Sequence, residues 1–164
     1  KRQLFLCTGN ICRSPVAEVV AAHLFGKRGL RFASAGLDAP TGRAASAGSV
    51  ACVDSWGLDL AAHRSRPVTP EILESVGWVI GMTRSHAALF RSRFGAGFPG
   101  RIGYLGAPGV DLAGGGPSPA GEEVEDPYGG SRDRYAAACG KIRRLMADWH
   151  DSFAALGEDR KGNG

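Results

Sequence analysis

The sequence lacks the features of a membrane protein, a secreted protein and a nucleic-acid-binding protein. It has no run of about eighteen apolar residues and no apolar signal sequence, so we expect no membrane contact. Its 4 cysteines have no tight metal-ligand spacing, which predicts no metal site and favours a reducing, cytoplasmic setting. A net charge of +4 without a dense basic run argues against binding nucleic acid, although the arginine excess suits an anionic substrate.

The length of 164 residues predicts one domain, over residues 1–157, with residues 158–164 expected to fray. Apolar strand segments alternate with helical segments, which predicts an α/β fold of three layers with helices on both faces of a parallel sheet. The expected strands span 3–6, 30–35, 78–82 and 101–105. The expected helices span 15–28, 43–56, 84–94 and 132–156, with a short helix after Thr69.

Two other features carry weaker expectations. Residues 106–121 are rich in glycine and proline without periodicity, which predicts a flexible surface loop of no assigned use. His23, His86 and His150 are expected on helix surfaces, because no other candidate functional residue accompanies them in the sequence.

The segment Cys7–Ser14 reads Cys-Thr-Gly-Asn-Ile-Cys-Arg-Ser and lies between an apolar run and an amphipathic stretch. A chain that leaves a strand, curls around an anion and starts a helix directs backbone N–H groups and the positive helix end at that anion. Arg13 can bind two oxygens of an oxyanion, and the same positive field favours the thiolate form of Cys7. Ser14 is expected at the helix N-cap and Pro15 at the first helical position. The segment predicts a phosphate-binding loop with a cysteine nucleophile.

This segment resembles the signature of the low molecular weight protein tyrosine phosphatases, Cys-x-Gly-Asn-x-Cys-Arg-Ser-Pro. Two further family elements follow in the same order, Ser34-Ala35-Gly36 and Asp126-Pro127-Tyr128, so the resemblance covers nearly the whole chain. It implies a four-stranded sheet in the order 2-1-3-4, with the loop at the carboxyl end of the first strand. It also implies a protein phosphatase that uses no metal and no organic cofactor.

The resemblance also implies roles for individual residues. Cys7 would attack phosphorus, Arg13 would hold two equatorial oxygens, and Asp126 would act as general acid and then as general base. Ser14 would hydrogen-bond the thiolate. The residues expected to form the phosphate-binding loop around Arg13 are Thr8, Gly9, Asn10, Ile11, Cys12 and Ser14.

Supporting roles follow from the same resemblance. Asn10, Ser34 and His63 resemble the family residues that hydrogen-bond the loop in its strained shape, while a plain surface position is the alternative for His63. Cys12 could form a protective disulfide with Cys7 under oxidation, as in the family, or could simply pack in the core.

The expected substrate is a phosphorylated protein or peptide, and the expected oligomeric state is a monomer. Tyr128 and Ile11 can supply apolar walls for the ring of a phosphotyrosine. Two departures weaken this reading. Gly129 stands where many tyrosine-specific members have a second aromatic residue, and the loop 37–42 contains no aromatic residue.

These departures, together with the segments Gly81–His86 and Asp126–Ser131, resemble the protein arginine phosphatase branch of the superfamily. That branch has threonine where this chain has Ile11, and the threonine hydroxyl helps to orient the attack on phosphoarginine. The sequence therefore favours phosphotyrosine, with phosphoarginine as the alternative. A thioredoxin-coupled arsenate reductase shares the fold but needs two further cysteines after the third strand, and residues 80–100 contain none.

Overall fold

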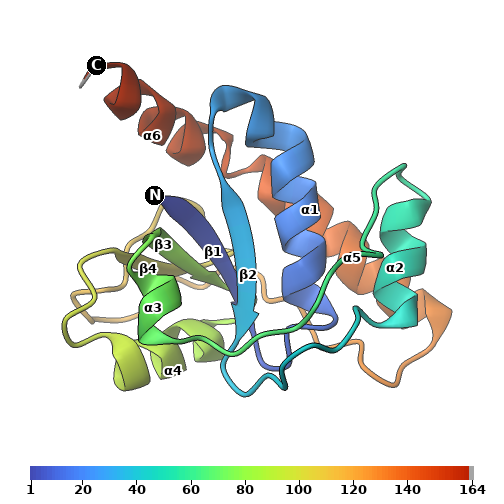
Figure 1. Ribbon diagram of the computed structural model, residues 1–164. Coiled ribbons are helices and arrows are strands. Elements are labelled where there is room, and N and C mark those ends of the chain that lie inside the picture. The colour runs from blue at the N-terminus through green and yellow to red at the C-terminus, as the bar shows by residue number, and fades with distance from the viewer. Residues whose placement is uncertain (163–164) are drawn as a thin grey trace.

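The computed structural model describes residues 1–162 and contains a four-stranded parallel sheet in the order β2-β1-β3-β4 (Figure 1). The strands are β1 (Arg2–Cys7), β2 (Phe32–Gly36), β3 (Val76–Gly81) and β4 (Arg101–Tyr104). The strand order reverses beside β1, and ligands bind at the carboxyl edge of open parallel sheets at such a point. The predicted class and strand order are confirmed.

Helices cover both faces of the sheet, as expected (Figure 1). They are α1 (Arg13–Phe25), the 3₁₀ turn η1 (Gly26–Arg28), α2 (Ala47–Asp54), α3 (Pro70–Leu73), α4 (Arg84–Phe94), α5 (Arg132–Ala147) and α6 (His150–Gly162). Alternate residues of β1 enter two separate cores. Phe5 packs with α1, α5 and α6, whereas Leu4 and Leu6 pack on the side of α3 and α4. None of the helices within residues 1–162 has the length and hydropathy to cross a bilayer.

Two helices near the carboxyl end of β1 start at residues that the sequence did not predict. Helix α1 begins at Arg13 with Cys12 as its N-cap, so Ser14 lies in the first turn rather than at the cap. Helix α2 begins at Ala47 instead of residue 43, because Arg43 is held in a backbone pairing with Ser65. In that pairing Ser65 N–H donates to the Arg43 carbonyl at 2.7 Å.

The predicted final helix 132–156 is two helices, which makes that prediction wrong. The chain breaks between α5 and α6 at Trp149, a buried residue whose Nε1–H donates to the Leu105 carbonyl at 2.8 Å. Trp149 also packs edge-on against Trp78 of β3 at 5.1 Å between ring centroids. Helix α6 runs to Gly162, beyond the predicted end. Fraying of the tail stays a prediction, and its last residues, 163–164, lie outside the described residues.

The loop 106–121 is attached to the edge strand β4 at several points. Asp111 Oδ1 accepts the N–H groups of Ile102 at 3.1 Å and Ala113 at 2.9 Å. Tyr104 Oη donates to the Pro119 carbonyl and accepts from Gly121 N–H. These contacts tie the loop to β4 at Asp111 and near its C-terminal end, while its flexibility stays a prediction.

Candidate active site

Cys7 is the last residue of β1 and is buried at the base of the loop that leads to α1. Its Sγ lies 2.9 Å from Ser14 Oγ, and that oxygen accepts a hydrogen bond from Asn10 Nδ2 at 2.9 Å. Asn10 Nδ2–H donates to one lone pair of the Ser14 oxygen. The proton of the Ser14 hydroxyl is therefore available to donate to the sulfur.

The loop keeps its shape through Asn10, which is fully buried and has a left-handed backbone with φ of 56°. Its Nδ2 donates to Ser34 Oγ of β2 at 3.0 Å, and its Oδ1 accepts Arg66 N–H at 3.0 Å. His63 Nε2–H donates to the Asn10 carbonyl at 2.7 Å. The three residues predicted from the sequence as supports, Asn10, Ser34 and His63, therefore lie in one hydrogen-bonded network.

Arg13 starts α1, and its guanidinium is buried with only part of its hydrogen-bonding capacity used. Nη1 donates to the Val124 carbonyl at 3.0 Å, and Nη2 lies 3.9 Å from Asp126 Oδ2. Nε is buried and has no hydrogen-bond partner among the described residues. A buried guanidinium N–H without an acceptor is costly, and an oxyanion in the loop is the partner that its geometry suits.

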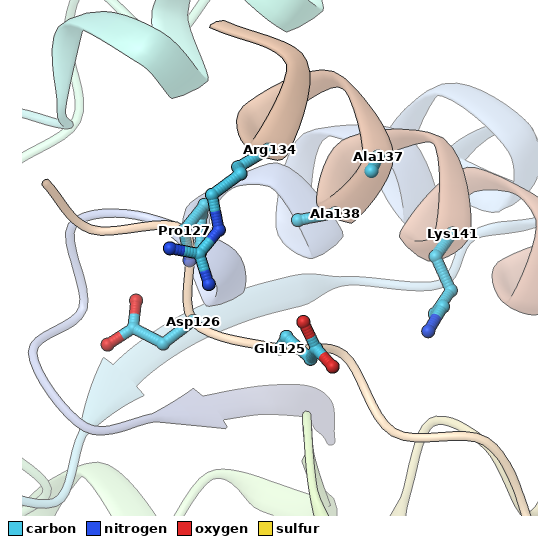
Figure 2. Close-up of a pocket in the computed structure, with 7 residues that line it drawn as sticks. All are labelled: Glu125, Asp126, Pro127, Arg134, Ala137, Ala138 and Lys141. Carbon is cyan, nitrogen blue, oxygen red and sulfur yellow. The ribbon is translucent and has the colours of Figure 1, made fainter. Parts of the chain in front are cut away.

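Asp126 is an exposed residue of the segment that leads into α5. Its Oδ1 accepts Tyr128 N–H at 3.1 Å, which holds the carboxylate in a tight turn. Figure 2 shows that the carboxylates of Asp126 and Glu125 point in opposite directions along this segment. A small pocket of about 110 Å³ lies behind the segment, between it and Arg134 and Lys141. Asp126 Oδ2 approaches Arg13 Nη2, and Asp126 also lines the pocket that contains Cys7.

A pocket of about 280 Å³ contains the candidate catalytic residues. Its lining residues are Cys7, Thr8, Gly9, Ile11, Cys12, Arg13, Pro40, Arg43, Asp126 and Tyr128. Tyr128 is 62% exposed, so it stands at the rim as an open wall. Pro40 and Arg43 were not predicted. Arg43 is exposed and forms no ion pair with any described side chain.

Residues 2–161 match the family model described as low molecular weight phosphotyrosine protein phosphatase. The chain belongs to this family. Phosphatase relatives from two bacteria agree with the match. A protein-arginine-phosphatase of Bacillus subtilis is 31% identical over 145 residues, covering 87% of this chain and 90% of the relative. The low molecular weight protein-tyrosine-phosphatase Wzb of Salmonella typhimurium is 26% identical over 152 residues, covering 93% of each.

The phosphatase fold is also shared with solved structures. A YwlE arginine phosphatase, solved as a Cys-to-Ser mutant with a phosphorylated active-site serine, superposes with a TM-score of 0.77. It is 28% identical in sequence, and the match covers 98% of this chain and 99% of that one.

Cys12 of the predicted phosphate-binding loop is buried, and burial raises the pKa of its thiol. Its Sγ lies 3.5 Å from Tyr135 Oη in the first turn of α5. Gly48 of α2 makes room for this tyrosine, because a Cβ there would lie 2.5 Å from Tyr135 Cγ. Both Cys7 and Cys12 are free thiols, so their disulfide stays a prediction. Nothing in the sequence pointed to Tyr135.

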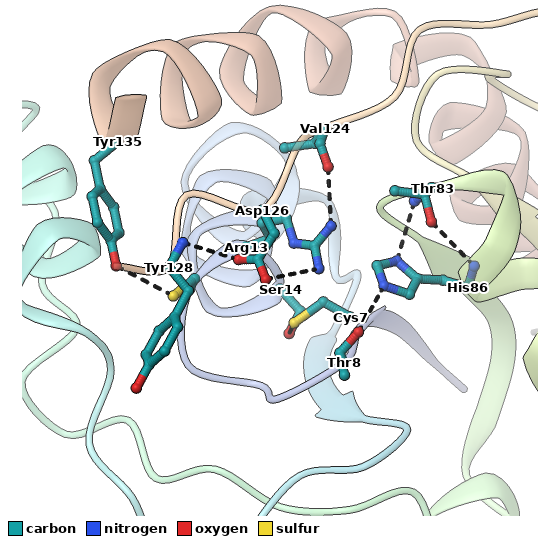
Figure 3. A network of polar contacts seen from close by, with 11 residues as sticks. Cys7, Thr8, Arg13, Ser14, Thr83, His86, Val124, Asp126, Tyr128 and Tyr135 are labelled. Atoms are coloured by element: carbon teal, nitrogen blue, oxygen red, sulfur yellow. Dashed lines mark hydrogen bonds and ion pairs between the residues drawn. The ribbon is translucent and has the colours of Figure 1, made fainter. Parts of the chain in front are cut away.

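His86 contradicts the prediction of a surface position. It is a buried residue of α4 that faces the predicted phosphate-binding loop, with Nε2 3.3 Å from Thr8 Oγ1 (Figure 3). Desolvation by burial, and then the positive charge of Arg13, lower its pKa to about 4. The spacing Thr83-x-x-His86 has the form of a helix capping box and could have indicated an inward-facing residue. No group of three or more His, Cys, Asp or Glu among the described residues is arranged to hold a metal ion.

Proposed function

We propose that this phosphatase hydrolyses phosphotyrosine in proteins or peptides through a cysteinyl-phosphate intermediate on Cys7. The observation that carries the proposal is the pairing of a buried sulfur with a buried, partly unsatisfied guanidinium in one pocket. Cys7 Sγ has a hydroxyl donor at 2.9 Å, and Arg13 Nε has no acceptor among the described residues. A phosphoryl group bound between them accepts from Arg13 and presents phosphorus to the sulfur.

In the first step the Cys7 thiolate forms a bond to phosphorus, and the bond from phosphorus to the phenolic oxygen breaks. Phenol has a pKa of about 10, so its oxygen leaves poorly unless it receives a proton. Asp126 supplies that proton from its position 3.9 Å from Arg13 Nη2, at the edge of the pocket. General acid catalysis of this kind contributes about 10²–10⁴-fold.

In the second step a water molecule attacks phosphorus, and the sulfur–phosphorus bond breaks. Asp126, now a carboxylate, accepts the proton from that water. The electron pair returns to Cys7 Sγ as a thiolate, which the Ser14 hydroxyl stabilises. Inorganic phosphate then leaves. The phosphorylated active-site serine of the YwlE mutant supports a covalent phosphoryl step at this loop.

Phosphoarginine is the second candidate substrate, because the Bacillus subtilis relative is a protein-arginine-phosphatase. Ile11 argues for phosphotyrosine, since it lines the pocket with an apolar side chain and has no hydroxyl to orient an attack on a guanidino phosphate. The open rim argues the other way, because Pro40 and Arg43 occupy the loop after β2 and supply no aromatic wall. A monomer in the cytoplasm remains our expectation, and the four free cysteines support a reducing compartment.

The test compares kcat/KM for two peptides of one sequence that carry either phosphotyrosine or phosphoarginine. Wild type is expected to prefer phosphotyrosine. Ile11→Thr should shift the ratio toward phosphoarginine, while Ile11→Val, which has nearly the shape of threonine without its hydroxyl, should not. A strong preference of the wild type for phosphoarginine would reverse the ranking of the two substrates.

A further inference from the structure

The segment from Gly81 to His86 joins β3 to α4 and forms a capping box. Thr83 is the N-cap of α4, and its Oγ1 accepts the His86 N–H at 3.2 Å. In return, Thr83 N–H donates to His86 Nδ1 at 3.2 Å. Glutamate or glutamine usually fills the position of His86 in such a box, so an imidazole there brings a second ring nitrogen that the cap does not use.

That second nitrogen reaches the phosphate-binding loop because α4 packs closely on the end of β3. A Cβ at Gly81 would lie 2.7 Å from His86 Cβ and 3.0 Å from the Thr83 carbonyl oxygen, so this packing requires glycine. His86 Nε2 consequently lies 3.3 Å from the hydroxyl of Thr8, the residue that follows the nucleophile (Figure 3).

The hydrogen bonds determine which nitrogen carries the proton. Nδ1 accepts from Thr83 N–H, so a neutral His86 ring is protonated at Nε2. Burial and the charge of Arg13 keep the pKa of His86 near 4, so the ring is neutral at pH 7. Nε2–H therefore donates to Thr8 Oγ1. A hydroxyl that accepts in this way keeps its own proton for another acceptor.

We propose that His86 is a positioning residue for this phosphatase: it holds the Thr8 hydroxyl so that its proton is donated into the nucleophile pocket, to an oxygen of the reacting phosphoryl group. Thr8 lines the same pocket as Cys7 and Arg13, so a donor there reaches the region in which negative charge develops. The inference rests on the proposed phosphatase function. It also gives the segment Gly81–His86 a role in the reaction rather than in the scaffold alone.

Two substitutions at His86 separate its two hydrogen bonds. His86→Asn places an acceptor near the Nδ1 position and keeps the cap, but it has no donor that reaches Thr8. His86→Gln places an amide donor near the Nε2 position. Because one neutral hydrogen bond is lost, His86→Asn should lower kcat for p-nitrophenyl phosphate about three- to tenfold with little change in KM. His86→Gln should recover part of that loss.

A double-mutant cycle with Thr8 tests whether the effect passes through its hydroxyl. In a Thr8→Val background, His86→Asn should have no further effect on kcat. Thr8→Ser, which keeps a hydroxyl, should exceed Thr8→Val in kcat/KM even if the His86 variants fold poorly. His23→Asn is the matched control, since His23 is an exposed histidine in the last turn of α1, at the opposite end of that helix from the loop.

The possible outcomes separate this inference from the function on which it rests. Equal kcat for wild type and His86→Asn, an undiminished His86→Asn effect in the Thr8→Val background, or equal activity of Thr8→Ser and Thr8→Val would each overturn the positioning role. Turnover that persists in Cys7→Ser would instead overturn the proposed function, whatever the His86 variants do.

Discussion

Replacing Asn10 tests how the phosphate-binding loop is held in shape. The Asn10 side chain makes three hydrogen bonds, to Ser14 Oγ, to Ser34 Oγ and from Arg66 N–H. Each is buried or half-buried and contributes about 1 kcal/mol net to the free energy of unfolding. The backbone has φ of 56°, which costs an alanine about 1–2 kcal/mol and costs glycine nothing. Asn10→Ala should therefore lower the free energy of unfolding by about 4–5 kcal/mol.

Asn10→Gly removes the same hydrogen bonds, but glycine adopts the left-handed backbone without strain. Its free energy of unfolding should therefore fall by only about 3 kcal/mol. Glycine would then be more stable than alanine at this position by about 1–2 kcal/mol, the reverse of the usual order in regular structure. Domains of this size have a free energy of unfolding of about 5–15 kcal/mol, so both decreases are measurable by urea denaturation at pH 7.

The stabilities of the two variants, compared with each other and with wild type, test the backbone strain and the hydrogen bonds separately. If Asn10→Ala proves as stable as Asn10→Gly or more so, the left-handed backbone at residue 10 does not hold in solution. If both variants lose less than about 1 kcal/mol, the hydrogen-bond network around Asn10 does not support the loop.

Three further predictions concern the acid, the buried histidine and the rim. Asp126→Asn should slow hydrolysis of phenyl phosphate, whose leaving group needs a proton, about 10²–10³-fold, and p-nitrophenyl phosphate much less; equal slowing of the two esters would remove the acid role. His86 has its pKa lowered from 6.5 to about 4, so its contribution to stability is complete above pH 6.5 and declines as the pH falls toward 4. Between pH 7 and pH 4, the free energy of unfolding measured in urea should consequently fall by roughly 2–3 kcal/mol more for wild type than for His86→Asn. Parallel pH profiles of the two proteins would contradict the burial of a neutral ring. Arg43→Gln should lower kcat/KM about two- to fivefold for a phosphotyrosine peptide with a neighbouring glutamate and little for its glutamine counterpart, as expected for an exposed ion pair; equal changes would show that Arg43 does not contact the substrate flank.

The phosphate-binding loop could be predicted from sequence because its chemistry is local. Cys7 and Arg13 lie within one strand-to-helix turn, and their spacing predicted sulfur and guanidinium around one anion. The Ser14 hydroxyl beside the sulfur followed from the family resemblance, and the spacing had placed Ser14 at the helix cap instead. The strand order and the contacts of Ser34 and His63 followed only from the family resemblance, since pairing across the sheet leaves no trace in local spacing.

The features that were missed depend on contacts between distant segments. Trp149 divides the final helix because it inserts beside Leu105 and Trp78, which helical periodicity cannot indicate. His86 reaches Thr8 across 78 positions in the chain, and only the absence of a side chain at Gly81 allows that approach. Arg43 enters the pocket because Ser65 holds its backbone, whereas its alanine-rich surroundings favoured a helix.

The most direct test of the central claim is to trap the phosphoryl group on the enzyme. Rapid acid quenching during turnover of a labelled aryl phosphate, followed by mass spectrometry of the peptide that contains residue 7, should detect phosphate bound to the sulfur of Cys7. Cys7→Ser should abolish turnover while phosphate still binds. Steady catalysis without any phosphorylated Cys7, or a Cys7→Ser variant with undiminished kcat, would contradict the account.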